Sequence, residues 1–303
     1  MMTAKKTIKG NLTTVDWRPA SGVSVLPAIP PPEYEASAKD IELFKRDGVV
    51  LQPSAFKSWV NTLQMGLEKH LGNPQDYAFP CESVEEGQPG RFFDSYCNWH
   101  RIQEYRDYIF QSCAASMAGQ FMRANTAQLF HEHVFCKESG TQIPTPWHHD
   151  LPYYSVDGFQ TVSIYIALDK IPEKTAIRFI KGSHKWGKLF SPRHFLDGSN
   201  YKHSDPTLHP IPDVEEELEK YEILVWELEP GDAVLFDFRT LHGTTGAKNS
   251  SRRRAFSTRW LGDDITYHER ASETSPPISL TNIHSGERLP EDCFPILWRR
   301  LTE

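Results

Sequence analysis

The chain has 303 residues, of which 39% are hydrophobic and 24% charged, and it carries a formal net charge of −7 at pH 7. This composition is typical of a soluble globular protein, and the acidic balance argues against general nucleic-acid binding, which usually needs a basic face. The sequence has neither the apolar run of a signal peptide nor a run of about 18 apolar residues that could span a membrane. Its five cysteines form no CxxC pair, so we expect reduced thiols, a cytoplasmic location, and no nucleic-acid or membrane partner.

Helices are predicted in the first part of the chain, after an irregular arm. Residues 1–36 are rich in proline and polar residues, which favours such an arm. A short helix is predicted over residues 37–46, with Ser37 as its N-cap. A longer helix is predicted over residues 54–71, because apolar side chains there follow helical spacing. Two further helices are predicted over residues 102–110 and 114–122.

Strands dominate the pattern from about residue 125. They are predicted over residues 127–136, 161–168, 177–180, 223–226, 233–236 and 254–261, after an earlier one at 49–51. Short strands behind a helical part favour a β-sandwich or jelly roll with helices packed outside. Residues 37–303 are thus predicted to form one domain with its barrel core at about 125–262. The polar segment 187–222 is interpreted as an insertion between barrel strands, or a lid over the site.

One stretch, residues 145–154, carries two histidines and an aspartate in an apolar, aromatic setting. Side chains of an extended chain alternate between faces, so His148 and Asp150 should point one way and His149 the other. Such a pair needs a third ligand to hold a metal ion, and His242, in an apolar strand–loop context far downstream, is the candidate. Two histidines and one carboxylate with open coordination positions form the facial triad of non-haem Fe(II) oxygenases.

Three arginines, Arg252, Arg253 and Arg254, open the strand that follows His242. Only one face of that strand can be inside a barrel, so the three cannot share one role. A buried guanidinium needs an anion, and the carboxylate of a bound cosubstrate would supply one in a bidentate pair. Arg252 is interpreted as part of a solvated turn. His184, in a Gly-Ser turn, is interpreted as structural, although a fourth metal ligand is an alternative.

Taken together and in order, these motifs resemble the phytanoyl-CoA dioxygenase family. The matching segments are residues 44–50, 147–153, 163–169, 181–184, 242–244 and 253–255. The resemblance spans roughly residues 38–262. It implies an all-β core with flanking helices, in the form of a double-stranded β-helix (a jelly-roll or cupin-like fold). It also implies a dioxygenase that depends on Fe(II), 2-oxoglutarate and O2.

The resemblance carries over to particular residues. His148, Asp150 and His242 match the catalytic iron ligands. The presence of Asp150 argues against halogenation, because halogenating relatives replace this aspartate by a small residue. The expected reaction is hydroxylation, or another oxidation of a C–H bond, of a small-molecule metabolite, with release of succinate and CO2.

The cosubstrate pocket is implied in the same way. Arg253 matches the arginine that pairs with the distal carboxylate of 2-oxoglutarate, and Thr244 matches a hydroxyl that helps to hold it. Tyr165 lies near an aromatic position that lines this pocket, and Lys137 matches a lysine ahead of the ligand loop.

Substrate contacts are predicted for the aromatic residues Trp147, Tyr153, Tyr154 and Phe93, for which core packing is an equally good interpretation. No strongly basic pocket for a CoA thioester is evident, so the family name is not extended to its substrate. One alternative is a metal-dependent cupin-type enzyme that does not use 2-oxoglutarate, and another is a non-catalytic binding protein. A zinc hydrolase is disfavoured because no HExxH motif is present. A monomer or homodimer is expected.

Overall fold

The computed structural model describes residues 5–8, 15–19, 32–85, 90–194, 199, 201, 205–245 and 251–301. Its α-helices are α1 (Ala38–Asp47), α2 (Val60–Gly72), α3 (Gln103–Gln111) and α4 (Ala114–Met122). Its 3-10 turns are η1 (Lys57–Trp59), η2 (Pro74–Asp76), η3 (Leu151–Tyr153), η4 (Glu173–Thr175), η5 (Ser183–Lys185) and η6 (Leu218–Lys220). None of the described helices is both long and apolar enough to cross a bilayer.

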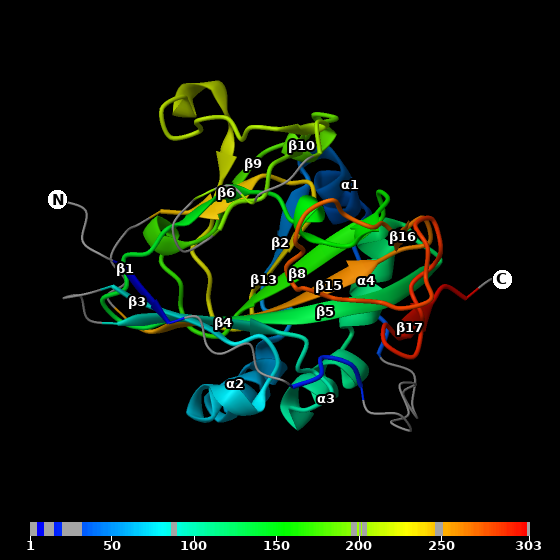
Figure 1. Cartoon of the computed structure of the whole chain (residues 1–303), viewed down its shortest axis with the longest axis horizontal. Helices are drawn as coiled ribbons and strands as arrows, with labels where there is room; N and C mark the ends of the chain where they lie inside the picture. The colour runs from blue at the N-terminus through cyan, green and yellow to red at the C-terminus, as the bar shows by residue number, and fades with distance from the viewer. Residues whose placement is uncertain are drawn as a thin grey trace.

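Two facing β-sheets form the core (Figure 1). The main sheet runs in the order β1 (Lys5–Ile8), β3 (Cys81–Glu85), β4 (Arg91–Tyr96), β5 (Thr126–Lys137), β15 (Arg253–Leu261), β8 (Thr161–Ala167), β13 (Ala233–Phe236) and β2 (Val49–Gln52), with β17 (Ile296–Arg299) also paired to β5. The small sheet runs β12 (Ile223–Leu224), β9 (Arg178–Ile180), β14 (His242–Thr244) and β6 (Thr145–His148). Two short ribbons pair β10 (Leu189–Phe190) with β11 (Leu208–His209), and β7 (Val156–Asp157) with β16 (Thr266–Tyr267). The predicted double-stranded β-helix is confirmed.

Alternation along the main strands separates a helix-facing side from an inner side. On β5, Val134 and Cys136 pack in the large apolar core with residues of the helices, whereas His133, Phe135 and Lys137 line a cavity between the sheets. The helices α2 and α3 cover the outer face of the main sheet, away from β6 and β9 (Figure 1). The inner side of β5 therefore presents His133 and Lys137 to the cavity, where a ligand can reach them.

Local sequence signals explain how α1 begins and ends. The Ser37 hydroxyl accepts a hydrogen bond from the Asp40 amide at 3.0 Å, as predicted for an N-cap. Gly48 ends the helix with φ +78°, and its amide donates to the Phe44 carbonyl at 2.8 Å. A Cβ at Gly48 would lie 2.4 Å from His184 Nδ1, so the backbone conformation and the close contact both require glycine.

Three sequence predictions of elements need correction. The arm predicted over residues 1–36 contains a strand, β1, which pairs with β3. The helix predicted from residue 54 begins at Val60, because Ser54 has φ +55° and donates its amide to Asp232 instead. The main sheet also recruits β2, β4 and β17 from outside residues 125–262.

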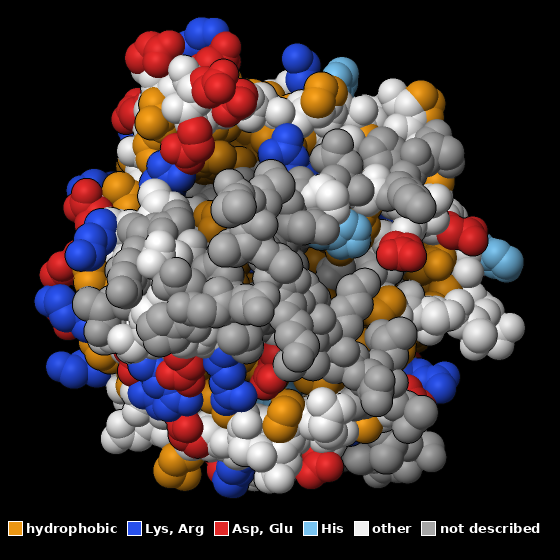
Figure 2. Space-filling model, turned by 60° about the vertical axis from the view of Figure 1, so that its left-hand side comes forward, with side chains coloured by type: hydrophobic (Ala, Val, Ile, Leu, Met, Phe, Trp, Pro, Cys, Tyr) orange, Lys and Arg blue, Asp and Glu red, His pale blue; other side chains and the backbone are white. Residues whose placement is uncertain are grey.

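The outer surface mixes both signs of charge. Figure 2 shows one face, on which acidic and basic side chains of the described residues are interspersed. This distribution agrees with the modest net charge of −7.

Candidate metal centre

The two predicted histidine ligands face each other across neighbouring antiparallel strands. His148 ends β6 and is the register partner of His242, which begins β14, and their ring centroids lie 4.1 Å apart. Nδ1 of His148 donates to the Pro146 carbonyl at 2.8 Å, and Nδ1 of His242 donates to the Thr240 carbonyl at 2.9 Å. Because each proton is used at Nδ1, both Nε2 atoms keep a lone pair for a metal ion.

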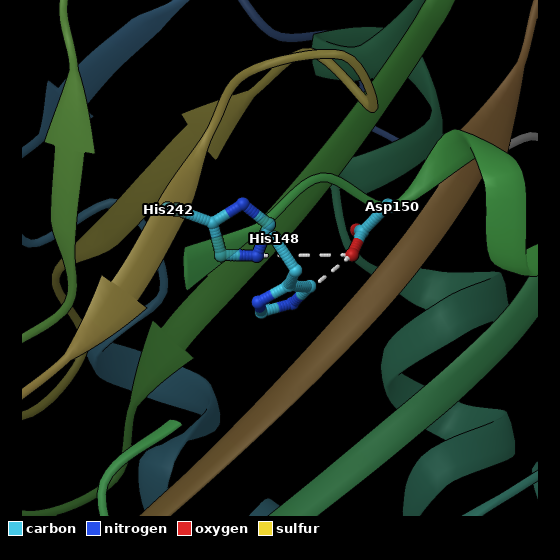
Figure 3. A group of neighbouring side chains, drawn as sticks. All are labelled: His148, Asp150 and His242. Carbon is cyan, nitrogen blue, oxygen red and sulfur yellow. Dashed lines mark ion pairs between the residues drawn. The ribbon is translucent and has the colours of Figure 1, made fainter. Parts of the chain in front are cut away.

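Asp150 completes the group, although not by the predicted strand alternation. The chain turns after β6, and Asp150 adopts helical angles (φ −70°, ψ −38°) as the residue before η3. The turn brings Asp150 Oδ1 to 3.8 Å from His148 Nε2 and 3.7 Å from His242 Nε2 (Figure 3). The three ligand atoms lie within 4.8 Å of one another, and no other such group was found within the described ranges.

The second histidine of the motif, His149, points away from this group, as predicted. Its Nδ1 donates to the Arg239 carbonyl at 3.3 Å, and its Nε2 accepts from the Phe190 amide at 2.9 Å. Both ring nitrogens are thus used in structural contacts. His184 also has a structural contact, because its Nε2 lies 3.2 Å from the Lys45 carbonyl.

The charge states of the three side chains fit a divalent metal ion. Burial lowers the pKa of His148 to about 3 and also lowers the pKa of His242, so both imidazoles are neutral at pH 7. Burial alone would raise the pKa of Asp150, but Arg259 and the two histidines bring it below its ordinary value. Two neutral imidazoles and one carboxylate are the donor set that Fe(II) takes in facial triads.

Arg259 holds the other oxygen of the Asp150 carboxylate. Asp150 Oδ2 lies 3.3 Å from Arg259 Nε and accepts from the Ser163 hydroxyl at 3.1 Å. Arg259 Nε also donates to the Tyr154 hydroxyl at 3.1 Å. Oδ1 is therefore the oxygen left for a metal ion. Alternation along β15 could have shown that Arg259 and Arg253, six residues apart, share the inner face.

A cavity of about 790 Å³ extends from the candidate metal ligands to the predicted cosubstrate residues. Arg253 is buried there, and its guanidinium donates to the Tyr165 hydroxyl at 3.2 Å and to the Thr175 carbonyl. The structure therefore places Arg253 and Tyr165 side by side at one end of the cavity.

Lys137 and Thr244 lie at the same end. Lys137 is the register partner of Arg253, and its Nζ donates to the Thr244 hydroxyl at 3.3 Å and to the Ile143 carbonyl at 2.7 Å. Burial and the charge of Arg253 hold the pKa of Lys137 well below its ordinary value. Among the described residues, no ion pair involves Lys137 or Arg253, so this end of the cavity is suited to an anionic group.

The other two arginines of the cluster lie outside the cavity. Arg254 pairs with Asp169 and Glu68, each at 2.7 Å, and Arg252 pairs with Glu68 at 2.7 Å. The alternation of β15 accounts for this separation, because Arg254 points to the face opposite Arg253.

Of the four predicted substrate residues, Tyr153 and Tyr154 line the cavity. The prediction for Phe93 is wrong in register: Phe93 packs in the core beneath the helices, and its neighbour Phe92 lines the cavity. Trp147 also lies outside the cavity. Its ring packs against the outer side of the small sheet, and its Nε1 donates to Glu215 at 2.7 Å.

Part of the cavity wall comes from a segment to which the sequence assigned no role. Most residues between Tyr267 and Ile278 line the cavity. Arg270 holds this segment against the chain that follows Asp150 by donating to the carbonyls of Tyr154 at 2.9 Å and Val156 at 2.7 Å. Such irregular chain has no periodicity from which its position could be inferred.

The described residues of the predicted insertion, residues 187–222, divide between the cavity and the outer side of the small sheet. Of its described residues, Arg193, His194 and Tyr201 line the cavity. Ile211 and Val214 pack instead against the outer side of the small sheet.

The family model for phytanoyl-CoA dioxygenase (PhyH) matches residues 44–255. The chain belongs to the phytanoyl-CoA dioxygenase family. It is accordingly an oxidoreductase, of the dioxygenase class that uses Fe(II) and 2-oxoglutarate. A search of curated proteins found no match in sequence.

Several solved structures have the same fold as this member of the phytanoyl-CoA dioxygenase family, although their sequence identity to it is low. The non-heme α-ketoglutarate-dependent carbocyclase SnoK from nogalamycin biosynthesis is 17% identical with a TM-score of 0.64, over 88% of this chain and 98% of SnoK. The epimerase SnoN, in complex with Fe3+, α-ketoglutarate and nogalamycin RO, is 18% identical with a TM-score of 0.65, over 86% and 98%. EctD from S. alaskensis, with 2-oxoglutarate and 5-hydroxyectoine, is 17% identical with a TM-score of 0.56, over 82% and 87%.

Proposed function

We propose that this protein oxidises a C–H bond of a small-molecule metabolite, using Fe(II) held by His148, Asp150 and His242 and 2-oxoglutarate held by Arg253. The observation that carries the proposal is the pairing of two incomplete sites in one cavity. A three-ligand group at one end needs a cation, and the buried Arg253 at the other end needs an anion. A metal ion chelated by a dicarboxylate would satisfy both.

Separate sets of residues would bind the metal ion and 2-oxoglutarate. The three ligands would fix the metal on one side and leave the positions facing the cavity open. Arg253, with Thr244 and Lys137, would receive the distal carboxylate of 2-oxoglutarate through charge-assisted hydrogen bonds. Tyr165 would keep the guanidinium in place from the side. This clamp would set the orientation of the cosubstrate.

When bound, Fe(II) and 2-oxoglutarate supply the oxidising power: O2 and 2-oxoglutarate are converted to succinate and CO2 while a substrate C–H bond is oxidised. The chain contributes placement and shielding. Tyr153, Tyr154 and the segment from Tyr267 to Ile278 would enclose the substrate beside the metal. A substrate bound within these walls would displace water from the reacting atoms.

Succinate release tests this function. Wild-type protein with Fe(II), O2 and 2-oxoglutarate should release succinate, and a metabolite screen should find a compound that stimulates the release. His148→Ala should bind little Fe(II) and release succinate at less than about 1% of the wild-type rate, because a facial triad cannot form from two ligands. Metal content gives an independent readout.

His284→Ala is the matched control, because His284 is an exposed histidine outside the cavity. Equal succinate release by wild type and His148→Ala would contradict the proposal. Iron binding without consumption of 2-oxoglutarate would favour the alternative cupin-type enzyme instead.

A further inference from the structure

A buried acid lies in the cavity outside both sites described so far. Asp94 of β4 is 6% exposed and lines the cavity, where its Oδ2 lies 4.0 Å from Nε2 of His133 on β5. Nε2 of His133 is itself buried and has no hydrogen-bond partner among the described residues. The Asp94 carboxyl group and His133 Nε2 are thus close enough for one polar group of a ligand to form hydrogen bonds with both.

No cation of the described residues is paired with Asp94. Lys137 is close enough to influence the pKa of Asp94, but its hydrogen bonds go to Thr244 and Ile143. Burial, with the charge of Arg259, holds the pKa of His133 well below its ordinary value, so His133 is neutral.

Few interactions with the protein therefore compensate the Asp94 carboxyl group for the hydration that it loses on burial. Desolvation raises the pKa of Asp94 to about 7, even though the Cys81 thiol donates a hydrogen bond and Lys137 contributes positive charge. A buried carboxyl group with this environment is either protonated or compensated by a ligand cation. A ligand that carries positive charge would gain the interaction that the protein itself does not provide.

The surroundings of Asp94 suit a cation on an apolar body. The cavity near it is lined by the aromatic side chains of Phe79, Tyr96, Phe135 and Tyr201. Aromatic faces attract cations, and organic ammonium groups in particular are bound by such rings together with an acid. Glu273, an exposed residue of the cavity wall, adds a second negative charge at the rim.

We propose that the substrate is a small organic amine whose ammonium group is held by Asp94, with His133 accepting a second hydrogen bond from it. This inference rests on the proposed function and narrows its substrate class. Arg253 and Lys137 would take the carboxylate of the cosubstrate, and Asp94 would take the ammonium group of the substrate. Asp94, His133 and the three candidate metal ligands line the same cavity, so a substrate held by Asp94 would extend from it toward the metal.

Matched pairs of ligands test this directly. Protein loaded with Fe(II) and 2-oxoglutarate under anaerobic conditions is titrated calorimetrically with phenylethylamine and phenylethanol, and with butyl- to octylamines and the corresponding alcohols. At least one amine should bind tenfold or more tightly than its alcohol. In Asp94→Asn the two should bind within about twofold of each other, because the carboxamide offers no charge.

Asp237→Asn is the control, since burial also raises the pKa of Asp237 to about 7 but that residue does not line the cavity. It should keep the preference for the amine. Wild type that binds no amine more tightly than its alcohol would overturn the proposal without any variant, as would a preference that survives in Asp94→Asn.

The charge-transfer absorption band of Fe(II)-bound 2-oxoglutarate, recorded in the wild-type samples before ligand is added, tests the proposed function separately. Absence of the band would contradict the proposed function. Presence of the band without amine selectivity would contradict only the amine site.

Discussion

Single side chains determine which atoms of the metal centre are free. Asp150 could offer two oxygens, but Oδ2 is held by Arg259 and Ser163. Arg259→Lys keeps the positive charge but loses the guanidinium, whose Nε reaches both Asp150 and Tyr154. We expect Fe(II) affinity to fall about 10- to 100-fold, as is usual when the support of a metal ligand is lost.

The measurement for Arg259→Lys is a metal titration at fixed pH. Arg254→Lys is the control, because Arg254 lies on the same strand and points out of the cavity toward Asp169. Unchanged affinity in Arg259→Lys would mean that the turn alone holds the Asp150 carboxylate.

A second prediction at the residue scale is that Arg253 and Arg252 differ in their contribution to the binding of 2-oxoglutarate. Arg253→Met should raise the KM for 2-oxoglutarate by roughly 30-fold or more, because loss of one member of a buried charge pair typically costs about 2 kcal/mol or more. Arg252→Met should change it less than about twofold, since Arg252 faces Glu68 near the surface. Initial rates of succinate release over a range of 2-oxoglutarate concentrations give both values. Equal effects would show that the cosubstrate lies elsewhere.

At the scale of elements, the junction between α1 and β2 supports the metal loop. The Gly48 carbonyl accepts hydrogen bonds from the Asp237 amide at 2.9 Å and the Thr240 hydroxyl at 2.8 Å, just ahead of His242. Gly48→Ala would add both backbone strain and a clash with His184. It should lower the free energy of unfolding by about 1–3 kcal/mol.

Urea denaturation measures that loss. Gly72→Ala is the matched control, because an added Cβ at Gly72 meets no atom within 4 Å. We expect it to be neutral or slightly stabilising. If both variants were equally stable, the conformation of Gly48 would not be required by the fold.

The sequence was most informative where the residue type itself determines the local structure or the kind of ligand that is bound. Ser37 indicates where α1 begins, and the residue types at 148, 150 and 242 predict a three-residue group that the fold does bring together. The geometry itself was not predictable, because η3 follows β6 at once and replaces strand alternation by a turn.

The face to which a strand residue points, and the position of chain outside helices and strands, could not be predicted for a different reason. A shift of one residue moves a side chain to the opposite face, so residue type alone does not separate Phe93, which packs in the core, from Phe92, which lines the cavity. The cavity wall from Tyr267 to Ile278 is defined by tertiary hydrogen bonds such as those of Arg270, which leave no periodic pattern in the sequence.

For the whole molecule, buried neutral histidines predict sensitivity to acid. Burial lowers the pKa of His70 to about 3, whereas the pKa of an unfolded histidine is about 6.5. The unfolded chain therefore binds more protons below pH 6.5, and the contribution of His70 to stability is lost as the pH falls from about 6.5 toward 3. Between pH 7 and pH 5 this single group should cost about 2 kcal/mol.

His70→Phe isolates that contribution, because phenylalanine retains the ring that packs against Tyr77 and Phe93. Urea denaturation measures the unfolding free energy at both pH values. From pH 7 to pH 5 it should fall by about 2 kcal/mol more in the wild type than in the variant. This comparison also cancels the opposite effect of acids such as Asp237, whose raised pKa favours the folded state as the pH falls. An identical pH difference in both proteins would contradict the prediction.

Both candidate ligand histidines, His148 and His242, orient their rings through the carbonyl two residues earlier in their own strand or turn. Each ring is thus aimed by a three-residue piece of backbone, and the pairing of β6 with β14 alone sets the distance between them. The wall that would contact a substrate comes from other parts of the chain, chiefly β4 and the segment after β16. Most of the surface that would select the substrate therefore lies outside β6 and β14, so this wall could be changed for a new compound while the strands that carry the two histidines are kept.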